Sequence, residues 1–266
     1  MSSSTITVLP TELCGLLVEL LDSSIDVLSF MRCSRLTFVE GERILYRHVR
    51  IRIDRLHTLD GMLDGLISNY ERVAFIQIFS LETVSIERLG GKLGIALNRM
   101  ANLRYLNLQP RNCFENVFNP RPRVSAAFPF NLTRFHCNYA GEKPYGLVEF
   151  LVSQPSIRHL RVQVYYHTKK LPLSTLPNLE SLDGPANIIN AFTPISRPIP
   201  RLTWRTSGDL FFTEFPDTPN TNLMALRLPT RHAPGLKRLP DLTPNLRYLQ
   251  CIVHHETVCP ITYIQK

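Results

Sequence analysis

A short apolar pattern returns along most of the chain and constrains the fold more than any other feature. Its first, fourth and sixth positions are apolar, as in Leu103, Leu106 and Leu108. The first positions of its eight copies are Val73, Leu103, Leu132, Ile157, Leu179, Ile199, Leu223 and Leu246. Successive copies start 20 to 30 residues apart. One copy would carry no information, but eight at quasi-regular spacing indicate that one structural unit is stacked many times.

Each copy predicts one short strand of a parallel, curved sheet, and the segments between copies return the chain. Apolar residues at helical spacing predict helices over 56–67, 84–100 and 147–152, whereas prolines predict irregular returns over 109–130 and 184–200. The pattern and its period resemble leucine-rich repeats, whose units have about 20–29 residues. The resemblance implies an α/β fold in which residues 54–266 form a solenoid with a parallel sheet.

In such a solenoid, the two residues that flank the middle apolar residue lie on the concave face of the sheet. Arginine and tyrosine are favoured in protein interfaces, and guanidinium groups pair with carboxylates and phosphates. We therefore expect this face to bind a target protein, through a segment that is acidic or phosphorylated. The alternative is a solvated strand face without a partner. The expected target-binding residues are Tyr105, Asn107, Arg134, His136, His159, Arg161, Arg201, Arg227 and Tyr248.

The first 53 residues have a helical periodicity. Leucines at three- and four-residue spacing predict an amphipathic helix over 13–21. Ser23 and Asp26 fit a capping box that starts a second helix, and a third is expected from about Ser34. Alternating apolar residues and arginines predict a strand over 49–53. A three-helix unit this small buries too little surface to be stable alone, so it indicates an interaction module.

This N-terminal segment resembles an F-box. The similarity is carried by Leu-Pro-Thr-Glu-Leu at 9–13, Cys-Ser-Arg-Leu at 33–36 and Leu-Tyr-Arg-His-Val at 45–49. It implies a helical docking module over residues 5–53 that binds the Skp-type adaptor of a cullin ubiquitin ligase. The alternative is that its leucines pack inside a single domain with the rest of the chain. By position, the resemblance assigns adaptor docking to Leu9, Pro10, Leu13, Leu16, Leu17, Leu20 and Leu28.

No motif in the sequence indicates catalysis. A phosphate-binding G-x-x-x-x-G-K-[ST] loop and a G-x-S-x-G nucleophile elbow are both missing. Cys251, His254, His255 and Cys259 are metal-binding residue types, but their spacing is not that of a zinc finger. We therefore expect no catalytic residue, no cofactor and no metal. The chain is expected to recruit a substrate while other subunits transfer ubiquitin.

The net charge of +8 is unevenly distributed. Residues 1–60 hold 7 Lys/Arg and 8 Asp/Glu, whereas residues 61–266 hold 23 and 14. A basic repeat region suits an acidic protein partner, a nucleic acid or solubility alone. Two further functions therefore stay open. One is a stand-alone leucine-rich-repeat scaffold, and the other is a nucleic-acid binder, which the lack of basic stretches interleaved with aromatic residues disfavours.

The sequence predicts an intracellular protein, cytoplasmic or nuclear, without a membrane contact. No apolar run approaches the ~20 residues that a membrane span needs. Residues 1–10 lack the basic and apolar regions of a secretory signal. The six cysteines are scattered and form no C-x-x-C pair, which is typical of buried thiols in a reducing compartment.

Overall fold

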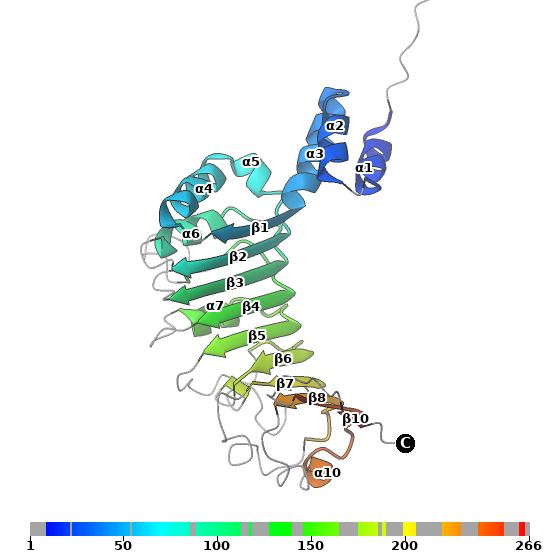
Figure 1. The fold of residues 1–266 in the computed structure, drawn as a ribbon, viewed down its shortest axis with the longest axis vertical. Helices are drawn as coiled ribbons and strands as arrows, with labels where there is room; N and C mark the ends of the chain where they lie inside the picture. The colour runs from blue at the N-terminus through cyan, green and yellow to red at the C-terminus, as the bar shows by residue number, and fades with distance from the viewer. Residues whose placement is uncertain are drawn as a thin grey trace, which may run out of the picture.

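Figure 1 shows an elongated molecule in which a helical N-terminal end is followed by strands that lie one after another along the longest axis. The structure is a computed structural model. The structure describes residues 9–21, 23–53, 55–85, 89–112, 117–118, 128–139, 146–164, 175–185, 188–189, 199–205, 220–229, 239–252 and 261–263.

Ten strands in the described residues form one sheet, and their order in the sheet is their order in the chain. Strands β1 to β9 pair in parallel, and β10 pairs antiparallel to β9. The α/β class and the parallel sheet are confirmed. The strands are β1 (His48–Ile53), β2 (Ile78–Ser85), β3 (Tyr105–Asn112), β4 (Arg134–Tyr139), β5 (His159–Val164), β6 (Ser181–Gly184), β7 (Arg201–Trp204), β8 (Ala225–Pro229), β9 (Tyr248–Ile252) and β10 (Ile261–Tyr263).

Helices occupy the N-terminal end and several of the returns between strands. They are α1 (Thr11–Glu19), α2 (Ser24–Met31), α3 (Arg35–Arg47), α4 (Leu56–Ser68), α5 (Tyr70–Val73), α6 (Gly90–Leu97), α7 (Leu147–Val152) and α10 (Leu239–Leu242). The helices predicted over 56–67 and 147–152 are confirmed as α4 and α7. The helix predicted over 84–100 is shorter, because β2 continues to Ser85 and pairs there with Asn112 of β3.

The apolar pattern builds one continuous core beneath the sheet. Its middle positions face one another across neighbouring strands, as Leu106, Phe135 and Leu160 do. These side chains are at most 2% exposed and belong to one cluster that runs from Ile51 to Cys251. Phe135 and Phe150 of α7 lie 5.1 Å apart between ring centroids. Each unit packs mainly on its neighbours, as expected for a stacked repeat.

The copy predicted at Val73, Ile76 and Ile78 has the wrong register. Strand β2 places Phe79 opposite Leu106 and Leu81 opposite Leu108. The three pattern positions of this unit are therefore Ile76, Phe79 and Leu81. Val73 is also buried in the core, but it belongs to helix α5. The prediction failed because α5 ends in an apolar residue three positions before Ile76, which imitates the start of the pattern.

A second, smaller core holds α1, α2 and α3 together. Val18, Val27 and Met31 are its buried members, with Ile44 and Leu45 of α3 packed against them. Among the described residues, it shares none with the core of the sheet. The three predicted helices are thus present, and they form a unit with its own packing.

The capping of these helices differs in detail from the prediction. The hydroxyl of Ser23 accepts from the N–H of Ile25 at 3.1 Å, but among the described contacts Asp26 returns none, so this box is incomplete. The complete capping box begins α3. There Ser34 Oγ accepts from Thr37 N–H at 3.1 Å, and Thr37 Oγ1 accepts from Ser34 N–H at 2.9 Å.

Helix α3 runs into the sheet without a linker, because His48 both ends α3 and begins β1. Although the sequence placed this strand with the N-terminal segment over 5–53, β1 pairs in parallel with β2. Ile51 of β1 is 2% exposed and belongs to the core of the sheet. The helical unit is therefore connected to the sheet by continuous secondary structure.

Candidate functional site: two interaction surfaces

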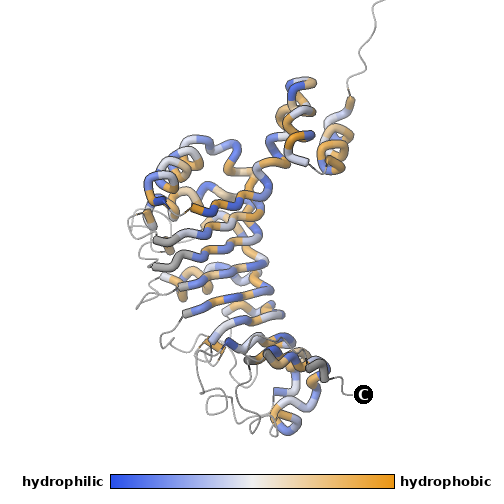
Figure 2. Tube along the Cα trace, viewed as in Figure 1, coloured by the Kyte–Doolittle hydropathy of each residue, from blue (hydrophilic) through white to orange (hydrophobic). Residues whose placement is uncertain are grey.

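The N-terminal helices carry an apolar surface that the described residues leave exposed. Figure 2 shows α1 as mostly hydrophobic although it lies apart from the sheet. All seven residues predicted to dock the adaptor are exposed, and Leu16 and Leu20 are 57% and 75% exposed. We call them the leucine face, which comprises Leu9, Pro10, Leu13, Leu16, Leu17, Leu20 and Leu28.

The leucines are exposed because α1 packs on its other side. Its buried residues are Cys14, Gly15 and Val18. A Cβ atom at Gly15 would lie 3.2 Å from Arg43 Nη2 and 3.3 Å from Glu40 Oε2, so the glycine lets α3 come close. In the described part of the chain, neither core includes a residue of the leucine face.

Three exposed apolar residues that the sequence analysis did not select extend the apolar surface of the unit. Ile25 of α2 is 71% exposed, and Phe38 and Val39 of α3 are 43% and 45% exposed. Their spacing gave no separate signal, because they lie among the residues that pattern these helices as amphipathic. Exposed apolar patches of this kind mark surfaces that bind other proteins.

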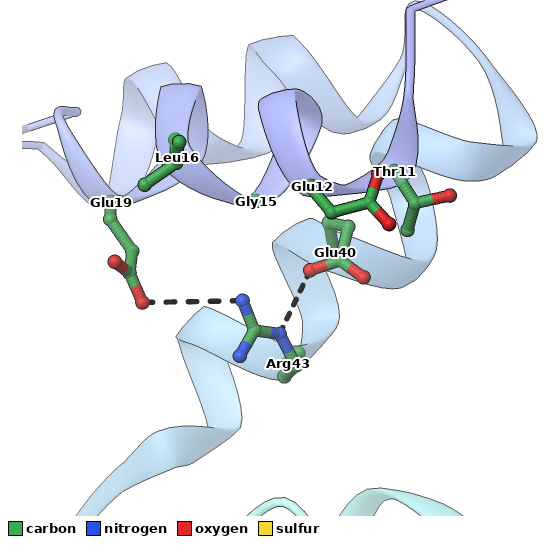
Figure 3. A pocket seen from close by; sticks show the side chains of 7 residues that line it. All are labelled: Thr11, Glu12, Gly15, Leu16, Glu19, Glu40 and Arg43. Atoms are coloured by element: carbon green, nitrogen blue, oxygen red, sulfur yellow. Dashed lines mark hydrogen bonds and ion pairs between the residues drawn. The ribbon is translucent and has the colours of Figure 1, made fainter.

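Acidic side chains border the leucine face. A groove of about 390 Å³ between α1 and α3 is lined by Thr11, Glu12, Gly15, Leu16, Glu19, Glu40 and Arg43. Figure 3 shows Arg43 reaching between Glu19 and Glu40. Arg43 Nε donates to Glu40 Oε2 at 2.8 Å, and its Nη2 lies 4.0 Å from Glu19 Oε1. The groove therefore lies between Leu16 of the leucine face and glutamates whose charge Arg43 partly neutralises.

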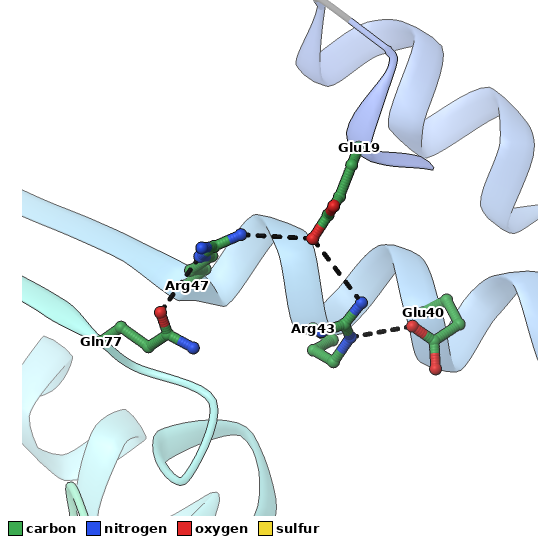
Figure 4. A network of polar contacts seen from close by, with 5 residues as sticks. All are labelled: Glu19, Glu40, Arg43, Arg47 and Gln77. Carbon is green, nitrogen blue, oxygen red and sulfur yellow. Dashed lines mark hydrogen bonds and ion pairs between the residues drawn. The ribbon is translucent and has the colours of Figure 1, made fainter. Parts of the chain in front are cut away.

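Polar contacts fix the helical unit on the first strands. Figure 4 shows Arg47 between Glu19 of α1 and Gln77, which precedes β2. Arg47 Nε donates to Gln77 Oε1 at 3.2 Å, and its Nη1 lies 3.3 Å from Glu19 Oε1. Nearby, Arg72 of α5 forms an ion pair with Glu42 of α3, with 2.7 Å between Arg72 Nη2 and Glu42 Oε1.

The second surface lies on the sheet, where the predicted target-binding residues fall into two rows across the strands. We call these rows the polar strip. Its first row, in register from β3 to β9, is Tyr105, Arg134, His159, Ser181, Arg201, Ala225 and Tyr248. Its second row is Asn107, His136, Arg161, Asp183, Thr203, Arg227 and Gln250.

The two rows differ in exposure. Arg134, Arg201 and Tyr248 of the first row are exposed, and so is Arg227 of the second. By contrast, Asn107 and His136 are only 7% and 8% exposed. The structure therefore brings all nine predicted residues together on one face but leaves these two little surface for a partner.

Asp183 organises the middle of the strip. It accepts from both Arg205 Nε and Arg205 Nη2, the latter at 3.0 Å to Oδ2, and lies 3.3 Å from Arg161 Nε. Arg205 follows β7 and was not predicted from the sequence, because it lies beyond the repeat pattern. Its position two residues after Thr203, on the same side of the strand, was the available signal.

Neither histidine adds positive charge at neutral pH. Burial and the positive charge of Arg161 lower the pKa of His136 to about 4. Burial and the neighbouring Arg134 also lower the pKa of His159. The positive potential of the strip therefore comes from its arginines.

Three of those arginines have no ionic partner among the described residues. They are Arg134, Arg201 and Arg227. Of the residues that make up the polar strip, only Asp183 has a carboxylate. Because Asp183 is already held by two guanidinium groups, the strip keeps a surplus of positive charge.

Within the described part of the chain, no group of three or more His, Cys, Asp or Glu residues could hold a metal ion. Cys251 is buried in the core, whereas His254, His255 and Cys259 lie outside the described residues. Over the same part of the chain, no helix has both the length and the apolar character that crossing a bilayer requires.

No family model matches the sequence, and no curated protein is significantly similar to it. A functional conclusion therefore rests on the leucine face and the polar strip.

Proposed function

We propose that the chain is a non-catalytic, substrate-recruiting subunit of a Skp–cullin–F-box type ubiquitin ligase. In this proposal the leucine face binds the Skp-type adaptor and the polar strip binds a target protein. Other subunits transfer ubiquitin. The observation that carries the proposal is the exposure of the seven leucine-face residues on a small helical unit with a core of its own.

The F-box resemblance agrees with where its motif residues lie. Pro10 is the residue before the first turn of α1, and Ser34 caps α3. The closing Leu-Tyr-Arg-His-Val at 45–49 spans the passage from α3 to β1. The apolar pattern of the leucine-rich-repeat resemblance agrees with the parallel sheet, in which each copy supplies one strand.

The energetics favour a partner for the leucine face. Fully burying one leucine side chain contributes about 1.5–3 kcal/mol. Leu16 and Leu20 are more than half exposed, so most of this contribution is unused in the free chain. A partner that covers several leucines at once would offset the entropic cost of association, which is on the order of 4–15 kcal/mol.

The test is binding of the purified chain to a purified Skp-type adaptor, measured by calorimetry. The variant Leu16→Ser/Leu20→Ser removes the two most exposed leucines and is expected to abolish binding. The control Leu56→Ser/Met224→Ser changes two apolar residues that are 48% and 46% exposed outside the leucine face. It should bind normally. If the unmodified chain does not bind, or the leucine variant binds like the control, the proposal is wrong.

A stand-alone repeat scaffold, with the helices as an N-terminal cap, is the second candidate. A cap would bury its apolar residues on the first strand, as terminal repeats do. Here the helices bury theirs in a separate cluster and leave the leucines exposed. The calorimetric experiment separates the two functions, since a scaffold has no reason to bind the adaptor.

A further inference from the structure

We propose that the polar strip binds an acidic segment of the target protein, extended across the strands and carrying carboxylate side chains four residues apart. The inference deepens the proposed function, since it names the class of target. Its physical basis is the sheet alone, so it can be tested apart from adaptor binding.

The spacing of the unpaired arginines sets the length of the segment. Arg134 on β4 and Arg201 on β7 lie in one row, three strands apart. Neighbouring strands are about 4.8 Å apart, which separates the two positions by roughly 14 Å. An extended peptide rises about 3.3 Å per residue, so residues i and i+4 lie roughly 13 Å apart with side chains on the same side. Two carboxylates at this spacing would meet both guanidinium groups.

A second pair repeats the geometry. Arg161 on β5 and Arg227 on β8 are also three strands apart, in the second row. Arg227 is unpaired among the described residues, and the Arg161 side chain keeps 39% of its surface open. Because the separation is the same in both rows, an acidic segment could bind along either row. A segment with two pairs of carboxylates could contact both rows at once.

The same arrangement favours carboxylates over phosphate groups. A phosphate dianion is best held by several guanidinium groups at one point, whereas a single guanidinium fork matches one carboxylate. Arg134 and Arg201 are separated by His159 and Ser181 in their row, so their two guanidinium groups start from positions three strands apart.

A nucleic-acid backbone fits less well. Its phosphates form an uninterrupted negative chain, which would cross the carboxylate of Asp183 in the middle of the strip. The strip's aromatic residues, Tyr105 and Tyr248, stand at its two ends on β3 and β9. They cannot stack successive bases as single-strand binders do.

The experiment uses the full chain and synthetic peptides whose only charges are two glutamates, titrated by NMR at low salt. A peptide with the glutamates at i and i+4 is expected to bind about fivefold or more tightly than one with them at i and i+3, where they face opposite sides. The variant Arg134→Glu/Arg201→Glu should weaken binding at least about tenfold. Arg55→Glu reverses one exposed arginine beside β1, outside the polar strip, and as a control should leave binding unchanged.

Equal affinity for both spacings, or no effect of the double variant, would overturn the inference. So would binding of only a phosphoserine peptide or only single-stranded DNA, each titrated in parallel. Binding of the Arg134→Glu/Arg201→Glu variant to the adaptor is measured as well. It distinguishes a failure of the acidic-segment inference from a failure of the proposed function. If the variant binds the adaptor and no peptide binds the unmodified chain, the inference alone is wrong.

Discussion

Arg47 and Gln77 are joined by two hydrogen bonds that connect the helical unit to the sheet. Arg47 Nε donates to Gln77 Oε1 at 3.2 Å, and the Gln77 N–H donates to the Arg47 carbonyl oxygen at 3.0 Å. The Gln77 carbonyl oxygen in turn accepts from the N–H groups of Arg104 and Tyr105. One residue thus ties the end of α3 to the start of β3.

The side-chain bond between these residues should make a measurable contribution to stability. In a double-mutant cycle of Arg47→Ala and Gln77→Ala, we expect a coupling free energy of about 0.5–1.5 kcal/mol. Urea unfolding of the four proteins measures it. A coupling of zero would mean that the side-chain bond adds nothing to the stability of the junction.

A glycine in α3 sets how closely α2 can pack. A Cβ atom at Gly41 would lie 2.1 Å from Met31 Cγ and 2.8 Å from Met31 Sδ. Gly41→Ala should therefore destabilise the helical unit by about 1–3 kcal/mol, despite the better helix propensity of alanine. Gly65→Ala in α4 is the matched control, because no described atom outside the neighbouring turns of its own helix would lie within 4 Å of an added Cβ. It should stabilise the chain by about 0.5–1 kcal/mol, and thermal unfolding distinguishes the opposite signs.

The two sides of α1 should respond differently to substitution. Val18 is fully buried in the small core, whereas Leu20 is 75% exposed. Val18→Ala is expected to lower the free energy of unfolding by about 2 kcal/mol, and Leu20→Ser by at most about 0.5 kcal/mol. Chemical unfolding of both variants checks the difference. Equal losses would indicate that Leu20 is buried in solution.

The buried histidine of the strip should make the fold sensitive to mild acid. The pKa of His136 is about 4 in the folded chain, against an ordinary value of 6.5. Below pH 6.5 the unfolded chain therefore binds a proton that the folded chain does not bind. The free energy of unfolding should fall between pH 6.5 and 4, by up to about 3 kcal/mol.

His136→Gln should remove this contribution. Because carboxylates also titrate in this range, the informative quantity is the difference between the unmodified chain and the variant at pH 7 and pH 4.5. We expect urea unfolding to give a smaller loss for the variant. Identical pH dependence in both proteins would contradict the burial of an uncharged imidazole.

Removing the central carboxylate should strengthen anion binding while it weakens the fold. Asp183→Asn keeps the shape but leaves the charges of Arg161 and Arg205 uncompensated. We expect a loss of about 1–3 kcal/mol in stability, since the side chain of Asp183 is only 16% exposed. The same variant should bind the acidic i, i+4 peptide several-fold more tightly. Weaker peptide binding would show that Asp183 positions the arginines rather than masking them.

The sequence predicts the sheet well because its information is local and repeated. Residues such as Leu106 and Phe135 recur at a spacing that only a stacked unit explains, and their strands pair in the expected order. The first unit was misread because Val73 of α5 imitates a pattern position. A helix end and a strand start are indistinguishable over six residues.

The surfaces were less predictable, because exposure depends on neighbours that one segment does not contain. Leucine spacing in α1 is equally compatible with a core-facing and an exposed helix, and the outcome depends on how Gly15 lets α3 approach. Likewise, nothing within β4 distinguishes exposed Arg134 from buried His136. The pairing of Asp183 with Arg205 depends on a residue beyond the repeat pattern.

Because α3 continues directly into β1, the number of strands sets the distance between the helical unit and any residue of the sheet. Because each strand adds about 4.8 Å, Arg134 on β4 is offset from the first strand by roughly 14 Å, and Arg201 on β7 by roughly twice that. A chain with one repeat more before β4 would carry the polar strip about 4.8 Å farther from the helical unit. The distance between the leucine face and the polar strip can therefore change in steps of one repeat while the residues of both surfaces stay the same.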